Sequence, residues 1–281
     1  MSKAVIQRYI SNEKDFKIIC NHFSFLVEKI KKFGFEYSLE IRQDYFNLYY
    51  SGNSIGKIIL KSPKKTYPIS IHKKFLKNTN IKKKFSGKDK NQYVYFDISP
   101  NKLSSFFSEK NLKALSQRVK GVNYQEEISF EQALITDNIG REDFIIIDRQ
   151  IVDHASSRKI DLLALKWVGG DNFQFCILEV KLGNNPELKG DVIGQLKGYV
   201  ERIEDYFEAY KKSYERNFEQ KRKLGLITVP QKVIIIPGVI GIVVVGGYGG
   251  IAEKSIKELK SKDKEIKILH LQNKIDFTKV Y

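Results

Sequence analysis

Three charged side chains interrupt two apolar segments in the second half of the chain. Asp161 stands in "KIDLLAL" (159–165), and Glu179 and Lys181 stand in "ILEVKLG" (177–183). Side chains alternate between the two faces of a strand, so Glu179 and Lys181 point the same way if the second segment is a strand. A charge buried without a partner costs several kcal/mol. These two residues therefore either pair with each other or take part in chemistry.

The segment between the two strands predicts that their acidic side chains meet. Gly169 and Gly170 mark a hairpin turn, which places Asp161 and Glu179 at similar heights on neighbouring strands. Two carboxylates at one end of a sheet suit Mg²⁺, which prefers oxygen ligands and lowers the pKa of a bound water. Lys181 would be placed to orient or deprotonate that water, or to stabilise the charge on a phosphate.

A purely structural interpretation competes with this one. Glu179 and Lys181 would then form an ion pair on an exposed edge strand, and Asp161 would be a turn residue at a strand end. The apolar flanks of Glu179 argue against an exposed edge, and "LLAL" continues the strand beyond Asp161. The pattern therefore favours a chemical site.

Asp161 followed by Glu179-Val180-Lys181 resembles the signature of the PD-(D/E)xK nuclease superfamily. The segments around it are expected to follow the order helix, three strands, helix, strand, helix, strand, which fits the α-β-β-β-α-β core of that family. The resemblance covers about residues 125–270. It implies a restriction-endonuclease-like fold, an α/β structure with a mixed sheet flanked by helices.

Two neighbouring helices carry further matches. Gln195 and Tyr199 form a Gln-x-x-x-Tyr pattern seen in one branch of the superfamily, and their spacing places them on one helix face. The resemblance implies that Gln195 supports the site or the substrate and that Tyr199 lies near the bound nucleic acid; both could instead only pack the helix on the sheet. Glu131, on the preceding helix, would reach the metal through water, although two acidic neighbours compete for that role. One departure is Ile160, where the signature has proline.

The resemblance also implies the activity, which is Mg²⁺-dependent hydrolysis of phosphodiester bonds, with Mn²⁺ able to substitute. Asp161 and Glu179 would hold the metal, and the backbone carbonyl of Val180 would add a ligand. Lys181 would position or activate water.

Nucleic acid is therefore the expected partner, with DNA preferred, in restriction or defence, repair or junction processing. Two alternatives stay open: a catalytically inactive nuclease-fold protein that binds nucleic acid, and an RNA-processing nuclease. Cutting two strands often uses two sites, so analogy at the level of the fold adds a homodimer to the expectations.

The positive charge of the chain is confined to its first part. The net charge is +16, and residues 1–120 contain 25 Lys and Arg against 9 Asp and Glu, whereas residues 121–281 contain 24 of each. This asymmetry favours a polyanionic partner for the first part, although a lysine-rich composition is the alternative. We expect a basic α+β domain over 1–120 that binds nucleic acid in a salt-dependent way, and a nuclease-like catalytic domain over 121–281.

Local patterns in the first part predict its elements. Apolar spacing predicts a helix over 15–33, and short runs bounded by turn residues predict an antiparallel meander after it. The lysine-rich segment 73–92 predicts a basic loop that contacts phosphates or is simply solvated. The expected phosphate contacts are Lys73, Lys74, Lys82, Lys83 and Lys84.

The second part shows similar local cues. A helix over 128–138 would begin with a capping box, in which Ser129 and Gln132 bond the first turn. A single long charged helix is expected over 187–218. "GGYGG" (246–250) lacks the ending of a phosphate loop and predicts a tight strand-to-helix turn instead.

Several classes of protein are disfavoured. The two cysteines, Cys20 and Cys176, belong to no metal-binding motif, so we expect free thiols in a reducing cytoplasm and no zinc. No uninterrupted apolar run is long enough for a membrane span, and no secretory leader is visible, so a membrane is not an expected partner.

Overall fold

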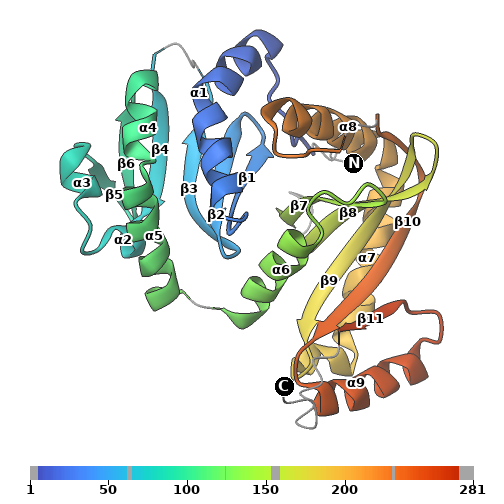
Figure 1. Cartoon of the computed structure of the whole chain (residues 1–281). Helices are drawn as coiled ribbons and strands as arrows, with labels where there is room; N and C mark the ends of the chain where they lie inside the picture. Colours follow the sequence, from blue (N-terminus) through green and yellow to red (C-terminus); the bar gives the residue numbers. More distant parts are fainter. Residues whose placement is uncertain (1–5, 62–64, 124, 153–158, 230–231, 272–281) are drawn as a thin grey trace, which may run out of the picture. The chain divides into compact units, whose positions relative to one another are not determined.

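The computed structural model describes residues 6–61, 65–123, 125–152, 159–229 and 232–271. It is a mixed α/β structure with two separate sheets (Figure 1). Contacts group the chain into two compact units. The N-terminal unit contains residues 7–140 and 212–230; the C-terminal unit contains residues 1–6, 141–211 and 231–281, as far as these are described. Residues 121–140 and 212–230 thus group with the N-terminal unit, although the sequence places the division near residue 120.

The N-terminal unit is built on a six-stranded antiparallel sheet with the strand order β1-β2-β3-β4-β6-β5. The strands are β1 (Tyr37–Arg42), β2 (Tyr45–Tyr50), β3 (Asn53–Ile59), β4 (Tyr67–His72), β5 (Lys88–Lys90) and β6 (Tyr93–Ile98). Burial alternates along β6, where Val94 and Phe96 are in the core and Tyr93 and Tyr95 are exposed. The meander expected from the sequence is confirmed.

The helix expected over 15–33 is confirmed as α1 (Glu13–Lys32). Asn12 caps it, because its Oδ1 accepts the N–H groups of Lys14 and Asp15 at 2.9 and 3.2 Å. Its apolar face is buried with the sheet residues in one core. The other longer helices of this unit include α5 (Glu109–Val122) and α6 (Glu126–Asp137), with a short α4 (Leu103–Phe106) before them, and most of α8 (Phe207–Leu224) also groups with it.

The prediction of a basic loop over 73–92 is wrong. The segment forms two short helices, α2 (Lys73–Leu76) and α3 (Ile81–Lys84), and then strand β5. Phe75, Leu76 and Ile81 are buried and anchor the helices. Each helix is one turn long, so its sequence is too short to show a helical period.

The C-terminal unit contains a five-stranded mixed sheet with the order β11-β10-β9-β8-β7. The strands are β7 (Phe144–Val152), β8 (Lys159–Gly169), β9 (Asn172–Leu182), β10 (Ile234–Gly246) and β11 (Ile268–Leu271). β7, β8 and β9 are antiparallel, and β10 runs parallel to β9 and β11. The expected hairpin joins β8 to β9, with Gly169 opposite Asn172.

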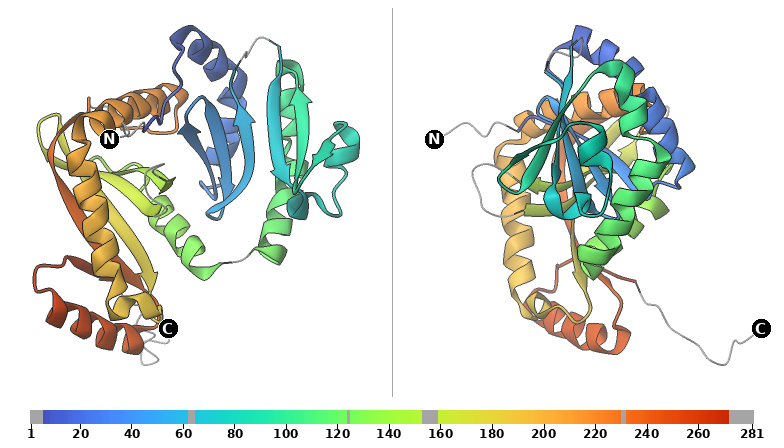
Figure 2. Two further views of the ribbon diagram at one scale, coloured as in Figure 1. Left: turned by 180° about the vertical axis from the view of Figure 1, so that it is seen from behind. Right: turned by 90° about the vertical axis from the view of Figure 1, so that its left-hand side faces the viewer.

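One long helix over 187–218 is also a wrong prediction. A 3-10 turn, η2 (Pro186–Lys189), comes first; α7 (Asp191–Asp205) follows, and the chain breaks at Tyr206 before α8 (Phe207–Leu224). Gly190, at φ 156°, separates η2 from α7. The views in Figure 2 show α7 running along the sheet, where Leu196 packs so close to Gly241 that a Cβ there would lie 2.9 Å from it.

Two local predictions for the ends of helices have opposite outcomes. The capping box is wrong, because α6 begins after Gln125 without a side-chain cap, and Ser129 lies inside the helix. The strand-to-helix turn is confirmed, because β10 ends at Gly246 and α9 (Gly249–Lys262) follows at once. None of the described helices is long and apolar enough to cross a membrane.

Candidate active site on β8, β9 and α7

The carboxylate of Asp161 lies against β9. The β8–β9 ladder ends at the Leu162–Leu178 pair, and Asp161 and Glu179 are the next residues on the two strands. There the N–H of Val180 donates to Oδ2 of Asp161 at 3.0 Å. The two strands therefore bring Asp161 next to Glu179, as the hairpin predicts.

Lys181 joins Glu179 to a further carboxylate. Its Nζ lies 2.9 Å from Oε1 of Glu179 and 2.9 Å from Oε2 of Glu187. Glu179 and Lys181 are only 2% and 6% exposed, so solvent screens this pair weakly. The ion pair considered from the sequence is present, but it lies in the core and involves more than two residues.

Glu187 was missed by the sequence analysis. It lies in η2, and Oδ1 of Asn185 holds the turn by accepting the N–H of Glu187 at 2.9 Å. The sequence shows an acidic residue soon after a strand end, next to a proline. Its return to Lys181 depends on the path of the turn, which the spacing does not specify.

One carboxylate oxygen of Glu179 has no hydrogen bond to any of the described residues. Oε2 is buried and lacks a donor among the described residues, while Oε1 is bound by Lys181. A buried carboxylate oxygen without a partner is destabilising by about 1–3 kcal/mol or more. With Asp161 beside it, this oxygen is suited to a cation that accepts oxygen ligands.

The electrostatics of the cluster favour a cation as well. Burial, followed by the negative charge of Asp161, raises the pKa of Glu179 from 4.5 to about 8, even though Lys181 opposes the shift. Burial lowers the pKa of Lys181, but the carboxylates of Glu179 and Glu187 raise it by more, and the net direction is upward. Lys181 is thus protonated at neutral pH, and one ammonium faces three carboxyl groups.

Helix α7 supplies the next side chains of the site. The hydroxyl of Tyr199 donates to the carbonyl of Lys159 at 2.8 Å. Burial, followed by the negative charges of Glu179 and Asp161, raises the pKa of Tyr199 to about 12. The structure therefore brings Tyr199 into the cluster, as its place in the motif predicts.

A hollow of about 620 Å³ opens beside Tyr199. It is lined by Gly190, Asp191, Gly194, Gln195 and Tyr199. Gln195 is half-buried in this wall, and a Cβ at Gly194 would meet nothing within 4 Å. Gly194 thus leaves open space in the wall of this hollow, which has room for a ligand larger than water.

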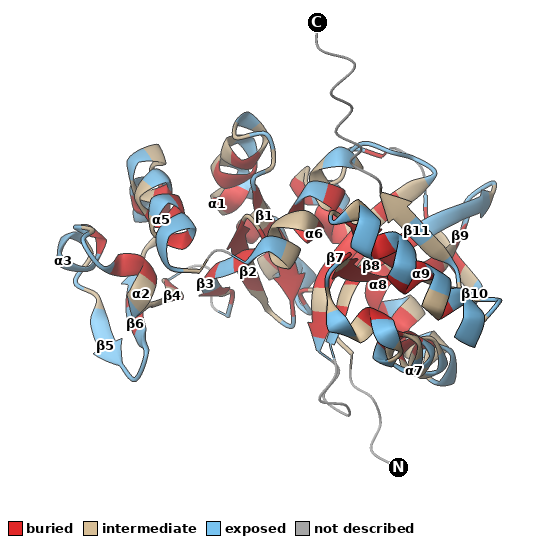
Figure 3. Cartoon of the chain, turned by 90° about the horizontal axis from the view of Figure 1, so that it is seen from below, coloured by how far each residue is buried: buried red, intermediate tan, exposed pale blue. Residues whose placement is uncertain are grey.

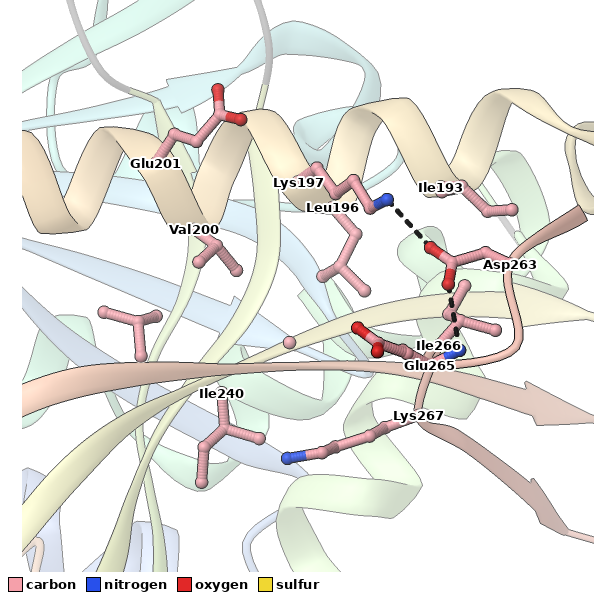
Figure 4. A pocket seen from close by; sticks show the side chains of 12 residues that line it. Ile193, Leu196, Lys197, Val200, Glu201, Ile240, Asp263, Glu265, Ile266 and Lys267 are labelled. Carbon is pink, nitrogen blue, oxygen red and sulfur yellow. Dashed lines mark hydrogen bonds and ion pairs between the residues drawn. The ribbon is translucent and has the colours of Figure 1, made fainter. Parts of the chain in front are cut away.

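A second hollow in the same unit, of about 380 Å³, is lined by different residues (Figure 4). It lies between α7 and β10 and is lined by Leu196 and Val200, with Lys197 and Asp263 paired across it at 2.8 Å. None of the residues expected from the sequence to form the site lines it. The candidate site is therefore the carboxylate cluster and not this hollow.

Glu131, expected to reach the metal through water, keeps that role only as a prediction. It is 2% exposed and lies on α6, which belongs to the N-terminal unit, where its neighbour Gln132 donates to the carbonyl of Phe35 at 3.1 Å. The further carboxylate of the cluster is that of Glu187.

The lysines expected to contact phosphates lie on α2 and α3 of the N-terminal unit. Lys82 pairs with Asp89 at 2.6 Å, and Lys73 lies 4.0 Å from the same carboxylate. Lys74 is half-buried and donates to Asn123 at 2.6 Å. The remaining two, Lys83 and Lys84, are exposed. This cluster is partly neutralised by its own acidic residue.

Neither a cluster of metal ligands nor a similarity to known proteins identifies this site independently. Among the described residues, no three His, Cys, Asp or Glu side chains form a group that could hold a metal ion. Mg²⁺ does not need such a group, because it commonly uses one or two carboxylates and keeps several waters. No protein-family model, curated protein or solved structure matches the chain.

Proposed function

We propose that the chain is a Mg²⁺-dependent nuclease that hydrolyses phosphodiester bonds, with DNA as the preferred substrate. The observation that carries the proposal is the buried Oε2 of Glu179, which lacks a hydrogen-bond donor among the described residues and lies beside Asp161. In this proposal the C-terminal unit has the restriction-endonuclease-like fold of the PD-(D/E)xK superfamily. The order of its helices and strands and the mixed sheet agree with that assignment.

The donor set fits a hard cation. Asp161 and Glu179 would hold the metal through oxygen atoms, and the carbonyl of Val180 is the further ligand that the resemblance implies. A bound Mg²⁺ would supply positive charge that lowers the pKa of a water and offsets the charge of the phosphate. Binding would also release the proton that Glu179 retains because of its raised pKa.

Lys181 would act as a positive charge and not as a base. Its pKa is shifted upward by two carboxylates, so it keeps its proton at neutral pH. A protonated lysine in a buried site can orient water by hydrogen bonding and stabilise negative charge that develops on a phosphate. Of the roles open to Lys181 from the sequence, the electrostatics favour these two.

The substrate would lie along the α7 side of the site. Gln195 and Tyr199 line the hollow on α7, and both carry polar groups suited to a phosphate or a sugar. The basic first part of the chain would add salt-dependent attraction to the nucleic acid backbone.

The test is cleavage of plasmid, single-stranded and branched DNA, and of RNA, with Mg²⁺ or Mn²⁺. We expect metal-dependent cutting by the wild type and none by Glu179→Ala or Lys181→Ala. The matched control is Lys197→Ala, which removes an exposed lysine–carboxylate pair elsewhere on α7 and should cut normally. A wild type that binds DNA but cuts no substrate with either metal would instead identify a nucleic-acid-binding protein. Cutting confined to RNA would identify the RNA-processing alternative.

A further inference from the structure

Two tyrosines on one face of β6 are exposed to solvent and are not part of the hydrophobic core. Tyr93 and Tyr95 are 44% and 41% exposed, while the intervening Val94 and the following Phe96 are buried. Residues two apart in a strand share a face and lie about 7 Å apart. That is about twice the 3.4 Å spacing of stacked nucleotides, so each ring has room for its own flat ligand.

Lysines on the edge strand lie in register with these rings. In the β5–β6 ladder Lys90 is opposite Tyr93 and Lys88 is opposite Tyr95, and directly opposed residues share a face of the sheet. Figure 3 shows β5 exposed along its whole length. The face therefore presents two rows, each made of one aromatic ring and one ammonium group.

The positive charges of these two lysines are available to a bound ligand. Among the residues that the structure describes, neither Lys88 nor Lys90 forms an ion pair; Asp89, between them, points to the opposite face and pairs with Lys82. On the other side of β6, His72 of β4 is opposite Tyr93, with ring centroids 5.3 Å apart in a T-shaped arrangement. This contact supports the Tyr93 ring from the side and leaves it exposed.

The positive charge continues across the sheet. Ser70 of β4 is opposite Tyr95, and Lys57 of β3 is opposite Ser70, so a small polar residue separates the ring from another exposed lysine. Asp97, two residues beyond Tyr95 on the same face, is exposed and limits the surface in that direction. The positive surface thus runs across the strands from β5 towards β3.

Ordinary strand chemistry explains only part of this surface. Lysines on an edge strand discourage sheet-to-sheet aggregation, and tyrosine is common in strands. Neither reason requires exposed rings and unpaired ammonium groups in matched register. Single-stranded nucleic acid requires both, because its unpaired bases stack on aromatic rings and its phosphates are attracted to a positive surface. A duplex keeps its base faces stacked inside and offers them no such contact.

We propose that this face of β5 and β6, formed by Tyr93, Tyr95, Lys88 and Lys90, binds single-stranded nucleic acid by base stacking. Each tyrosine takes one base, and each lysine lies beside the adjoining phosphate. The site belongs to the N-terminal unit and does not depend on hydrolysis at the carboxylate cluster. It is also separate from the lysines of α2 and α3.

The test measures binding by the full-length protein in EDTA, where no metal-dependent cleavage occurs. The probe is a fluorescein-labelled oligothymidine of about 12 nucleotides, followed by fluorescence anisotropy. We expect Tyr93→Ala and Tyr95→Ala each to weaken binding by about tenfold or more. Tyr93→Phe and Tyr95→Phe should bind like the wild type, because the ring remains. Lys88→Gln and Lys90→Gln should each lower the slope of log affinity against log salt by about 0.7.

The control is Trp167→Ala, which removes another exposed aromatic ring, 47% exposed, from a strand of the C-terminal unit. It should leave binding unchanged, and the thermal midpoints of all variants should match that of the wild type. An oligodeoxyuridine, an oligouridine and a hairpin duplex complete the comparison. Tighter binding of the single strands than of the duplex supports the proposal, and the better of the two uridine strands, which differ only in the sugar, identifies the sugar. Absence of wild-type binding, equal binding by the alanine variants, or equal binding of duplex would overturn it.

Discussion

The chain uses the same four-residue pattern twice, with different results. "LEIR" (39–42) lies in β1 of the N-terminal unit, and "LEVK" (178–181) lies in β9 of the C-terminal unit. In each, a glutamate and a cation two residues later share one face of a strand. All four charged residues are buried, with Glu40 and Arg42 at 6% and 3% exposure and Glu179 and Lys181 at 2% and 6%.

The difference lies in the partners that the rest of the fold supplies. Glu40 meets two cations, since Lys221 of α8 donates to its Oε2 and Arg42 lies 3.9 Å away. Lys181 instead meets two carboxylates, and Asp161 adds a third to the cluster. In the first case cations compensate the buried carboxylate. In the second a buried carboxylate oxygen has no donor among the described residues.

The comparison teaches that a Glu-x-cation pattern on a buried strand does not by itself indicate chemistry. An excess of cations around a carboxylate neutralises its buried charge, whereas an excess of carboxylates around a cation leaves negative charge that, in the proposed function, a metal ion would offset. Substitutions in the two clusters should therefore affect different properties.

The largest effect is expected from Glu179→Ala on cleavage. Loss of a metal-holding carboxylate removes several kcal/mol of transition-state stabilisation, which is about a 10³-fold loss of rate. Single-turnover cleavage with Mg²⁺ measures it. Glu40→Ala, assayed at a temperature where it remains folded, should keep the wild-type rate; an equal loss in both variants would remove the distinction between the clusters.

The next effect is on stability, and it falls on the other cluster. Glu40→Ala leaves Arg42 and Lys221 buried without their carboxylate, which should lower the free energy of unfolding by about 3–5 kcal/mol. Urea unfolding of the wild type and the variant measures the difference. A change below about 1 kcal/mol would show that the two cations find other partners and that the cluster is not structural.

A smaller effect should appear in the pH dependence of stability without metal. The folded pKa of Glu179, about 8, lies above its unfolded value of 4.5. The contribution of this group is therefore complete below about pH 4.5 and is lost as the pH rises through about 8. In EDTA, the free energy of unfolding should include a term that falls with pH by at most about 1.4 kcal/mol per unit.

The variant Glu179→Gln isolates that term, because glutamine does not titrate. Its stability should fall less steeply between pH 5 and pH 8 than that of the wild type, as urea unfolding at several pH values would reveal. Mg²⁺ added at pH 8 should restore stability to the wild type alone. Parallel pH profiles for the two proteins would show that Glu179 ionises normally.

The smallest effect is expected from Glu187→Gln. The side chain of Glu187 is 40% exposed, and Lys181 retains its bond to Glu179, so the free energy of unfolding should change by less than about 1 kcal/mol. The cleavage rate should fall by less than about tenfold, because Lys181 keeps its place and its proton. Glu219→Gln is the matched control, since Glu219 is 38% exposed in a pair with Arg222 and should leave the rate unchanged.

How much could be predicted depended on the range of the interactions. Strand alternation and the glycine turn placed Asp161 and Glu179 side by side, because these are local geometries with fixed periods. The position of Tyr199 near them was an expectation from the resemblance. The return of Glu187 to Lys181, the break at Tyr206 and the folding of 73–92 into short elements follow no such period. They depend on η2, on packing, and on the burial of Phe75 and Ile81.

The residues of this chain by themselves determined the mixed α/β class, the β8–β9 hairpin and the shared face of Glu179 and Lys181, because backbone geometry makes side-chain direction a function of spacing. Only the tertiary structure decided in which of the two Glu-x-cation patterns additional cations neutralise the buried glutamate. It brought Lys221 into contact with Glu40 and Glu187 into contact with Lys181, and it grouped Glu131 with the N-terminal unit. The physical reason is that the energy of a buried charge depends on every charge around it, and most of those come from distant parts of the chain.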